Sequence, residues 1–343
     1  MTEISGITDF IDQAGARCQV FDMGRRMQAL SREQFLAFER DGEPYPYPLQ
    51  QQAWLGIMVW HDSKPDDLVI WFVKFPLDAH GCLASAIRDD FVFRLINKDE
   101  PAESGQEDSN PYGFKPKQEH MASFHARAAR ILGQPPSRFY EHARDYFSGT
   151  PGFDQWAFVG FQGIADVVAR LDEDDNHQRL ADALPQLPAQ PLEAVCQCLE
   201  HEIIDDTLGD VLGTLLQQTL VAADAPDAYR ASLLIRAVSG AENQDRLAAL
   251  IEAVLNSPLA EHPEVIASIS GRCWLSLQQP RLMNRFLEVL ARCPEGQAFF
   301  NLVIVDLINI PGMQAPIHTA IRDPERSDTL ARAIGELFQQ YTQ

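Results

Sequence analysis

The sequence TLGDVLGTLLQQTLV, residues 207–221, repeats its apolar side chains with the period of an α-helix. Leu212, Leu215 and Leu216 stand at the i, i+3 and i+4 positions, which lie on one face of a helix. Residues 247–254, LAALIEAV, repeat this spacing. Each such stretch therefore predicts an amphipathic helix whose apolar face must be buried against another element.

Similar stretches fill the second half of the chain, separated by breaks that contain Pro, Gly and Asn. Helix pairs start about 35 to 39 residues apart, close to the ~40 residues of HEAT-like and armadillo repeats. We therefore predict that residues 118–343 form an all-α, HEAT-like helical-repeat domain, an α-solenoid. A plain helical bundle is the alternative, because residue identity between the repeats is weak. Helices are expected over residues 207–221, 228–238, 244–255, 263–277, 281–292 and 297–310.

The first part of the chain has the pattern of a sheet. Two apolar runs, WLGIMVW at 54–60 and LVIWFV at 68–73, flank the polar loop DSKPDD and predict two neighbouring strands. Their apolar residues are consecutive, so we expect both strands to be buried on both faces. Residues 18–22 alternate as a third strand should. Helices are predicted over residues 7–13, 32–40 and 80–97, the second capped by Ser31 with Gln34 three residues later.

The chain of 343 residues is longer than the roughly 250 to 300 residues at which single cores stop growing, so two domains are expected. The predicted fold class is α+β. Residues 1–99 form a small α+β domain with a short, mainly antiparallel sheet, followed by the helical-repeat domain. Residues 100–117 are polar and punctuated by Pro, which predicts a mobile acidic linker or loop between them.

The formal charge of −21 limits the choice of partners. A strongly negative field repels nucleic acids and anionic lipids and favours a basic protein or peptide. No apolar run approaches the ~20 residues of a membrane-spanning helix, and the N-terminus lacks the pattern of a secretory signal. The six cysteines are scattered, without the density of a disulfide scaffold. We therefore expect a cytoplasmic protein with reduced cysteines.

Sequence motifs for metal or cofactor chemistry are weak. Cys196, Cys198 and His201 are potential zinc ligands, but two cysteines two residues apart on a helix point to different faces. Residues 172–176, DEDDN, begin like a calcium loop but lack its glycine and its final glutamate. Phosphate-loop, dinucleotide-binding and nucleophile-elbow motifs are missing from the sequence. We predict no metal, no cofactor and no catalytic residue.

The segment FDMGRR, residues 21–26, offers the best candidate for a binding site. Asp22, Arg25 and Arg26 lie around a glycine turn, where the arginines could hold a carboxylate or phosphate. An inter-domain anchor or a solvated turn is the alternative. The aromatic residues of the two apolar strands could form a stacking platform for RNA, but the negative charge favours a role in the core.

The segments FDMGRR, residues 21–26, and YPYPLQQQAWLG, residues 45–56, resemble a family of uncharacterised bacterial proteins of about this length. The resemblance extends over the whole chain. It implies a bacterial cytoplasmic origin and no assigned activity.

These observations favour a non-enzymatic adaptor or scaffold, whose acidic helical-repeat surface binds a basic protein or peptide. The alternative is an enzyme with an inter-domain cleft that acts on a small anionic substrate held by Arg25 or Arg26.

Overall fold

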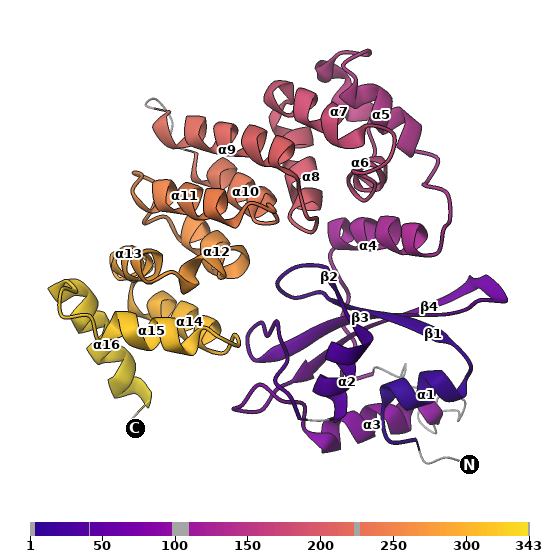
Figure 1. Ribbon diagram of the computed structural model, residues 1–343, viewed down its shortest axis with the longest axis horizontal. Helices are drawn as coiled ribbons and strands as arrows, with labels where there is room; N and C mark the ends of the chain where they lie inside the picture. Colours follow the sequence, from indigo (N-terminus) through magenta and orange to yellow (C-terminus); the bar gives the residue numbers. More distant parts are fainter. Residues whose placement is uncertain (1–3, 41, 98–109, 223–226, 342–343) are drawn as a thin grey trace. The chain divides into compact units, whose positions relative to one another are not determined.

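Figure 1 shows the computed structural model of the protein, which describes residues 4–40, 42–97, 110–222 and 227–341. The chain divides into two compact units, one of residues 1–116 and 309–311 and the other of residues 117–308 and 312–343. A small antiparallel sheet with helices precedes a long series of helices. This confirms the α+β fold class predicted from the sequence.

The sheet of the first unit has four strands in the order β2-β1-β3-β4, and every neighbouring pair is antiparallel. Strands β3 and β4 form a long hairpin that contains the two predicted apolar strands. The short strand β2 was not predicted, because three residues are too few for an alternating pattern. The strands are β1 Arg17–Asp22, β2 Gln28–Leu30, β3 Gln52–His61 and β4 Lys64–Pro76.

The helices α1 (Ile7–Gln13), α2 (Arg32–Arg40) and α3 (Ser85–Ile96) share one hydrophobic core with the sheet. Phe91 of α3 packs edge-to-face against Phe75 of β4, with ring centroids 5.2 Å apart. This contact confirms the prediction that the third helix covers one face of the sheet. Helix α3 begins five residues later than predicted, at Ser85, since residues 78–82 form a turn instead.

The predicted cap of α2 is also present. The backbone N–H of Gln34 donates to Ser31 Oγ over 3.0 Å, while the backbone N–H of Ser31 donates to Gln34 Oε1 over 2.9 Å. This reciprocal pair satisfies two backbone donors that a helix start leaves without partners.

The expectation that both apolar strands are buried on both faces is right for β3 and wrong for β4. Residues 55–58 of β3 are consecutive and all buried. In β4, burial alternates near the end, where Val73 and Phe75 are buried, and Val69 is 46% exposed. Residues 112–114 bridge the outer edge of β4 at Val73, close to its buried residues, whereas Val69 lies nearer the tip of the hairpin.

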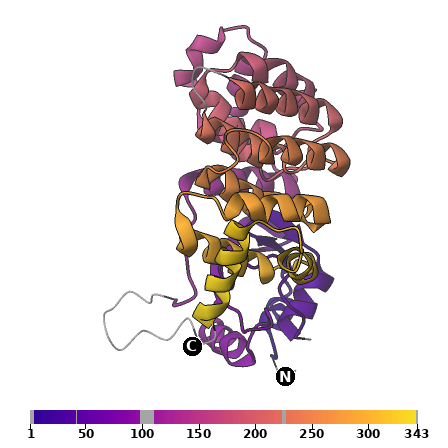
Figure 2. The same cartoon turned by 90° about the vertical axis from the view of Figure 1, so that its left-hand side faces the viewer.

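The second unit is a series of helices in two rows (Figure 1 and Figure 2). In one row α4, α6, α8, α10, α12 and α14 pack in succession, and in the other α5, α7, α9, α11, α13 and α15 do the same. Helix α16 packs on α13 and α14. The helices are α4 Gln118–Ile131, α5 Tyr140–Phe147, α6 Phe161–Val168, α7 Asn176–Ala183, α8 Ala189–Leu199, α9 Asp206–Val221, α10 Ala228–Val238, α11 Gln244–Leu255, α12 Pro263–Arg272, α13 Pro280–Leu290, α14 Gly296–Ile308, α15 Gln314–Ile321 and α16 Asp328–Tyr341.

The predicted helices agree closely with these bounds, and α10 and α11 agree at both ends. Helix α12 is shorter than predicted, since it ends at Arg272 and a separate 3₁₀ turn follows at Ser276–Gln278. Of the predicted linker at residues 100–117, residues 100–109 lie outside the described residues. Among the described helices, none has both the length and the apolar character required to cross a membrane.

Candidate functional site

The predicted site at the end of β1 is a compact buried turn. The Asp22 carboxylate accepts hydrogen bonds from the backbone amides of Gly24, Arg25 and Arg26, at 3.1 to 3.2 Å. The Tyr45 hydroxyl donates a further hydrogen bond to it over 2.8 Å. The amides that could receive an external anion at this turn therefore already bind Asp22.

Burial also controls the charges of this turn. It raises the pKa of Asp22 to about 6, and the hydrogen bonds from the turn and from Tyr45 counteract this rise only in part. Arg25 is fully buried, and its Nε donates to the Pro48 carbonyl over 2.6 Å. The structure thus brings the three predicted residues together, with Arg25 inside the protein. Their role as an anion or inter-domain anchor stays a prediction.

The aromatic residues of the hairpin are divided between the two faces of the sheet. Trp54 and Phe72 pack against Phe114, with ring centroids 4.9 and 5.9 Å apart. Trp71 packs instead against Phe91 of α3, on the other face. The contacts of these rings favour the predicted packing role over a single stacking platform.

The two cysteines considered as zinc ligands are buried in α8. Burial raises the pKa of the Cys196 thiol to about 12 and raises that of Cys198 as well. The Ser123 hydroxyl donates to Cys198 Sγ over 3.7 Å. Among the described residues, neither thiol belongs to a group of three or more potential metal ligands.

A buried charged cluster, which we call the Glu200 cluster, lies in the helical unit. It consists of Glu200, His201, His120, Arg236 and Arg272. Glu200 and His201 follow α8, while the other three belong to α4, α10 and α12. Serial packing of one row of helices brings these distant parts of the sequence together.

Glu200 lies at the centre of this cluster, with a side chain that is only 3% exposed. Its Oε1 accepts a hydrogen bond from Arg272 Nη2 over 3.2 Å, and its Oε2 lies 3.5 Å from Arg236 Nε. The Nε2 atoms of His201 and His120 lie 3.7 and 4.0 Å from Glu200 Oε1. Burial lowers the pKa of His120, which favours its neutral form.

The ligand atoms of His120, Glu200 and His201 all lie within 4.8 Å of one another. Two imidazoles and a carboxylate are a ligand set that zinc and non-haem iron use. However, the guanidinium groups of Arg236 and Arg272 contact the same carboxylate. Each pair of like unit charges 4 Å apart costs about 4 kcal/mol at an effective dielectric constant of 20. The cluster therefore fits a divalent cation poorly.

No sequence motif identifies the Glu200 cluster, because its residues come from three separate helices and from the turn that follows a fourth. His201 was considered with the neighbouring cysteines, but their spacing does not predict the observed contacts. One signal was present in the sequence: Arg236 and Arg272 stand about one repeat length apart, near the ends of helices in the same row.

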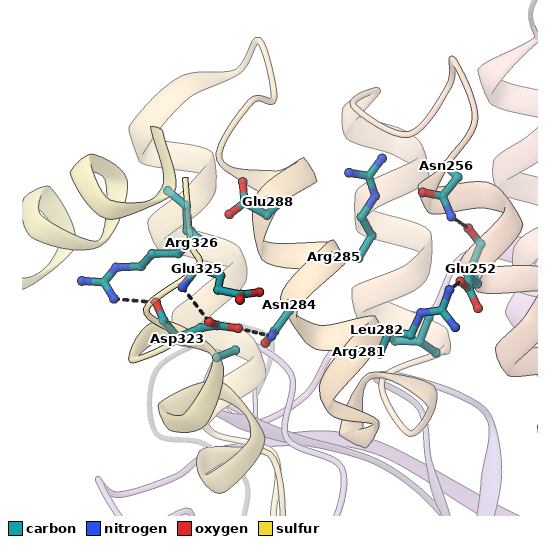
Figure 3. Close-up of a pocket in the computed structure, with 12 residues that line it drawn as sticks. Glu252, Asn256, Arg281, Leu282, Asn284, Arg285, Glu288, Asp323, Glu325 and Arg326 are labelled. Carbon is teal, nitrogen blue, oxygen red and sulfur yellow. Dashed lines mark hydrogen bonds and ion pairs between the residues drawn. The ribbon is translucent and has the colours of Figure 1, made fainter. Parts of the chain in front are cut away.

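A groove of about 460 Å³ lies on the other row of helices, between α11, α13 and the loop that connects α15 to α16. We call it the α13 groove (Figure 3). Its floor includes the apolar side chains of Leu282, Ala320 and Leu330. Its charged lining residues are Glu252, Glu288, Asp323, Glu325, Arg281, Arg285 and Arg326.

Several of these charged groups have partners within the groove. Arg281 pairs with Glu252, as Figure 3 shows, and Asn284 donates to Asp323. Arg285 Nε donates to a backbone carbonyl at the end of α11 over 3.1 Å. Glu325 is exposed. Its carboxylate is therefore accessible to a positively charged ligand.

No curated protein and no solved structure matches the chain. A family model described as "Protein of unknown function (DUF3549)" matches residues 2–338. This match confirms the resemblance to a family of uncharacterised proteins, and it covers nearly the whole chain. The protein therefore belongs to the DUF3549 family of proteins of unknown function.

Proposed function

We propose that the protein is a non-enzymatic adaptor, whose helical unit is a HEAT-like α-solenoid that binds a basic segment of another protein in the bacterial cytoplasm. The observation that carries this proposal is the serial packing of helices in two rows. Alternating helices pack on the next helix of their own row, as in repeat proteins, where each repeat contacts its neighbours and the array presents extended binding surfaces.

The spacing of the helices supports the repeat interpretation. Helices α9, α11 and α13 begin at Asp206, Gln244 and Pro280, intervals close to the ~40 residues of HEAT-like repeats. In a plain bundle, helices distant in sequence also pack around one shared core. The contacts between successive members of each row therefore favour a solenoid over a bundle.

The α13 groove is the place where we expect the basic segment to bind. Its apolar floor offers contact area, and its rim carries the exposed carboxylate of Glu325 beside that of Asp323. The formal charge of −21 would speed association with a basic segment. Added salt would weaken this effect, because it screens the charges. A short segment with two or more Lys or Arg residues beside apolar anchors fits this chemistry.

The experiment is affinity capture from the native bacterium with the full chain as bait, at increasing ionic strength, followed by mass spectrometry. We expect basic partners that are released as salt rises above physiological strength, because screening weakens exposed charge pairs. Glu325→Arg should reduce the capture of these partners at least several-fold.

The matched control is Glu336→Arg. Glu336 is also an exposed glutamate, but it lies on α16 and outside the groove lining. This variant should capture the same partners as the wild type. Partners retained equally by both variants and at all salt concentrations would contradict the proposal.

The alternative, an enzyme that holds a small anionic substrate with Arg25 or Arg26, has less support. Arg25 is fully buried, with its Nε donating to a backbone carbonyl. The three turn amides bind Asp22. An anion would have to displace these contacts in order to reach the turn.

A further inference from the structure

A second cavity lies on the row of helices that contains the Glu200 cluster. It has a volume of about 340 Å³ and lies between α10 and α12. We call it the Arg236 cavity. Its polar lining residues are Tyr229, Ser232, Arg236, Glu264, Ser268 and Arg272. The cavity thus contains both guanidinium groups that contact Glu200.

Arg236 is the residue of this cavity with the greatest unused capacity to donate hydrogen bonds. Its side chain is 28% exposed, and its Nε lies 3.5 Å from Glu200 Oε2. Among the described residues, no hydrogen bond donated by the Arg236 guanidinium group is found. Arg272, by contrast, donates to Glu200 and to the Gly271 carbonyl. Arg236 can therefore donate to a ligand in the cavity without breaking a hydrogen bond.

The lining of the cavity contains two arginines and one glutamate, although the chain as a whole is acidic. Glu200 is the one buried carboxylate that both guanidinium groups contact, so it balances only one of them. His120 carries no charge in its neutral form, which burial favours by lowering its pKa. Glu264 also lines the cavity at an exposed position, and the lining residue Tyr229 donates a hydrogen bond to a further carboxylate, that of Glu193. The anionic group of a ligand would be attracted by these two guanidinium groups and repelled by Glu264.

We propose that the Arg236 cavity binds a small organic oxyanion, whose phosphate or carboxylate group is held by Arg236 with support from Arg272. The planar guanidinium fork matches both groups with paired N–H···O hydrogen bonds. The volume lies at the low end of the range for small-molecule sites and leaves room for an organic part beside the anionic group. This site is independent of the α13 groove and of the adaptor role.

Calorimetric titration of the full chain with inorganic phosphate, glycerol phosphate and succinate tests the proposal. We expect saturable binding of one anion per chain, tighter for the organic anions than for inorganic phosphate. The ratio between glycerol phosphate and succinate then assigns the site to phosphate or carboxylate. Saturable binding of none of the three would overturn the proposal.

Three variants identify the site. Arg236→Gln should weaken binding at least tenfold, and its melting temperature reports whether the fold is intact. Arg230→Gln is the matched control, because Arg230 lies on the same helix outside the cavity lining. Glu264→Gln should tighten binding several-fold, since it removes a carboxylate that repels the anion.

Equal effects of Arg236→Gln and Arg230→Gln, or weaker binding by Glu264→Gln, would contradict this assignment. If phosphate, glycerol phosphate and succinate all fail to bind, the effect of zinc on the melting temperature identifies the alternative. Zinc would then raise the melting temperature of the wild type but not that of His120→Ala. That result would show that the Glu200 cluster is a metal site.

Discussion

Burial changes the pKa values of Asp22 and His120 in opposite directions, because it disfavours the charged form of each. It raises the pKa of Asp22 to about 6 and lowers the pKa of His120. Asp22 is therefore more readily protonated in the folded protein, and His120 less readily, than in the unfolded chain. Opposite pH dependences of stability follow from these two residues.

Asp22→Asn should remove a loss of stability that the wild type undergoes as pH rises. Between about pH 4 and about pH 6 the folded state retains the Asp22 proton that the unfolded chain has lost, so the free energy of unfolding falls across this window. As the pH rises through this window, the unfolding free energy of the wild type should therefore fall relative to that of the variant, by at most about 3 kcal/mol. Denaturant titrations at several pH values measure it, with Asp62→Asn at an exposed position as control. A constant difference would contradict the raised pKa.

His120→Gln should reduce the sensitivity of the protein to acid. The unfolded chain takes up a proton on this histidine below about pH 6.5, while in the folded protein burial, Arg272 and Lys117 oppose protonation and Glu200 favours it. Stability therefore rises with pH between the lowered pKa and about pH 6.5. Melting temperatures from about pH 5 to about pH 7.5 should show a shallower slope for His120→Gln than for His125→Gln, an exposed histidine on the same helix. Equal slopes would count against this explanation.

The sequence located some of these residues and not others, for a physical reason. Asp22 and Arg25 were predicted to lie together because a glycine turn joins neighbours in the chain. Glu200, Arg236 and Arg272 meet only after three helices of one row have packed. The sequence also did not reveal that Arg25 is buried, since this depends on how the chain around Pro48 folds over it.

At the scale of elements, Gly163 determines how closely α5 and α6 approach. A methyl group at this position would lie 2.5 Å from the Phe139 carbonyl oxygen and 3.1 Å from Ala143 Cβ. Gly163→Ala should therefore push the two helices apart and lower the free energy of unfolding by about 1 to 3 kcal/mol. Denaturant titration measures this change.

The matched control for that change is Gly335→Ala in α16. A methyl group there meets no described atom within 4 Å. Alanine should stabilise this helix by about 0.5 to 1 kcal/mol, because glycine loses more conformational freedom in a helix. Equal effects of the two substitutions would mean that the contact between α5 and α6 is not the cause.

Periodicity identified helices α9 to α14, but it did not determine all their ends. Helices α10 and α11 begin after Asp227 and Asn243, whose side chains accept hydrogen bonds from the first turn, so cap and period agree. Helix α12 ends at Arg272, although the apolar period continues through Leu277. Its last turn is closed by the Cys273 amide, and the following residues turn separately towards Pro280.

At the scale of the whole molecule, a solenoid and a bundle respond differently to damage. In a serial array each helix is stabilised mainly by its neighbours, so local damage spreads over short distances. In a bundle all helices share one core, and its loss affects them together. The contacts within each row of the second unit lead us to expect the first behaviour.

Phe286→Ala tests this expectation, because Phe286 is fully buried in α13 and its removal should cost about 3 to 5 kcal/mol. Hydrogen exchange should become faster in α11, α13 and α15, which pack in succession, and remain slow in α5 and α7. The reciprocal variant, Phe147→Ala in α5, should accelerate exchange in α5 and α7 and leave α13 and α15 protected. If either substitution instead accelerates exchange in all these helices equally, the helices share one cooperative core and the solenoid interpretation is wrong.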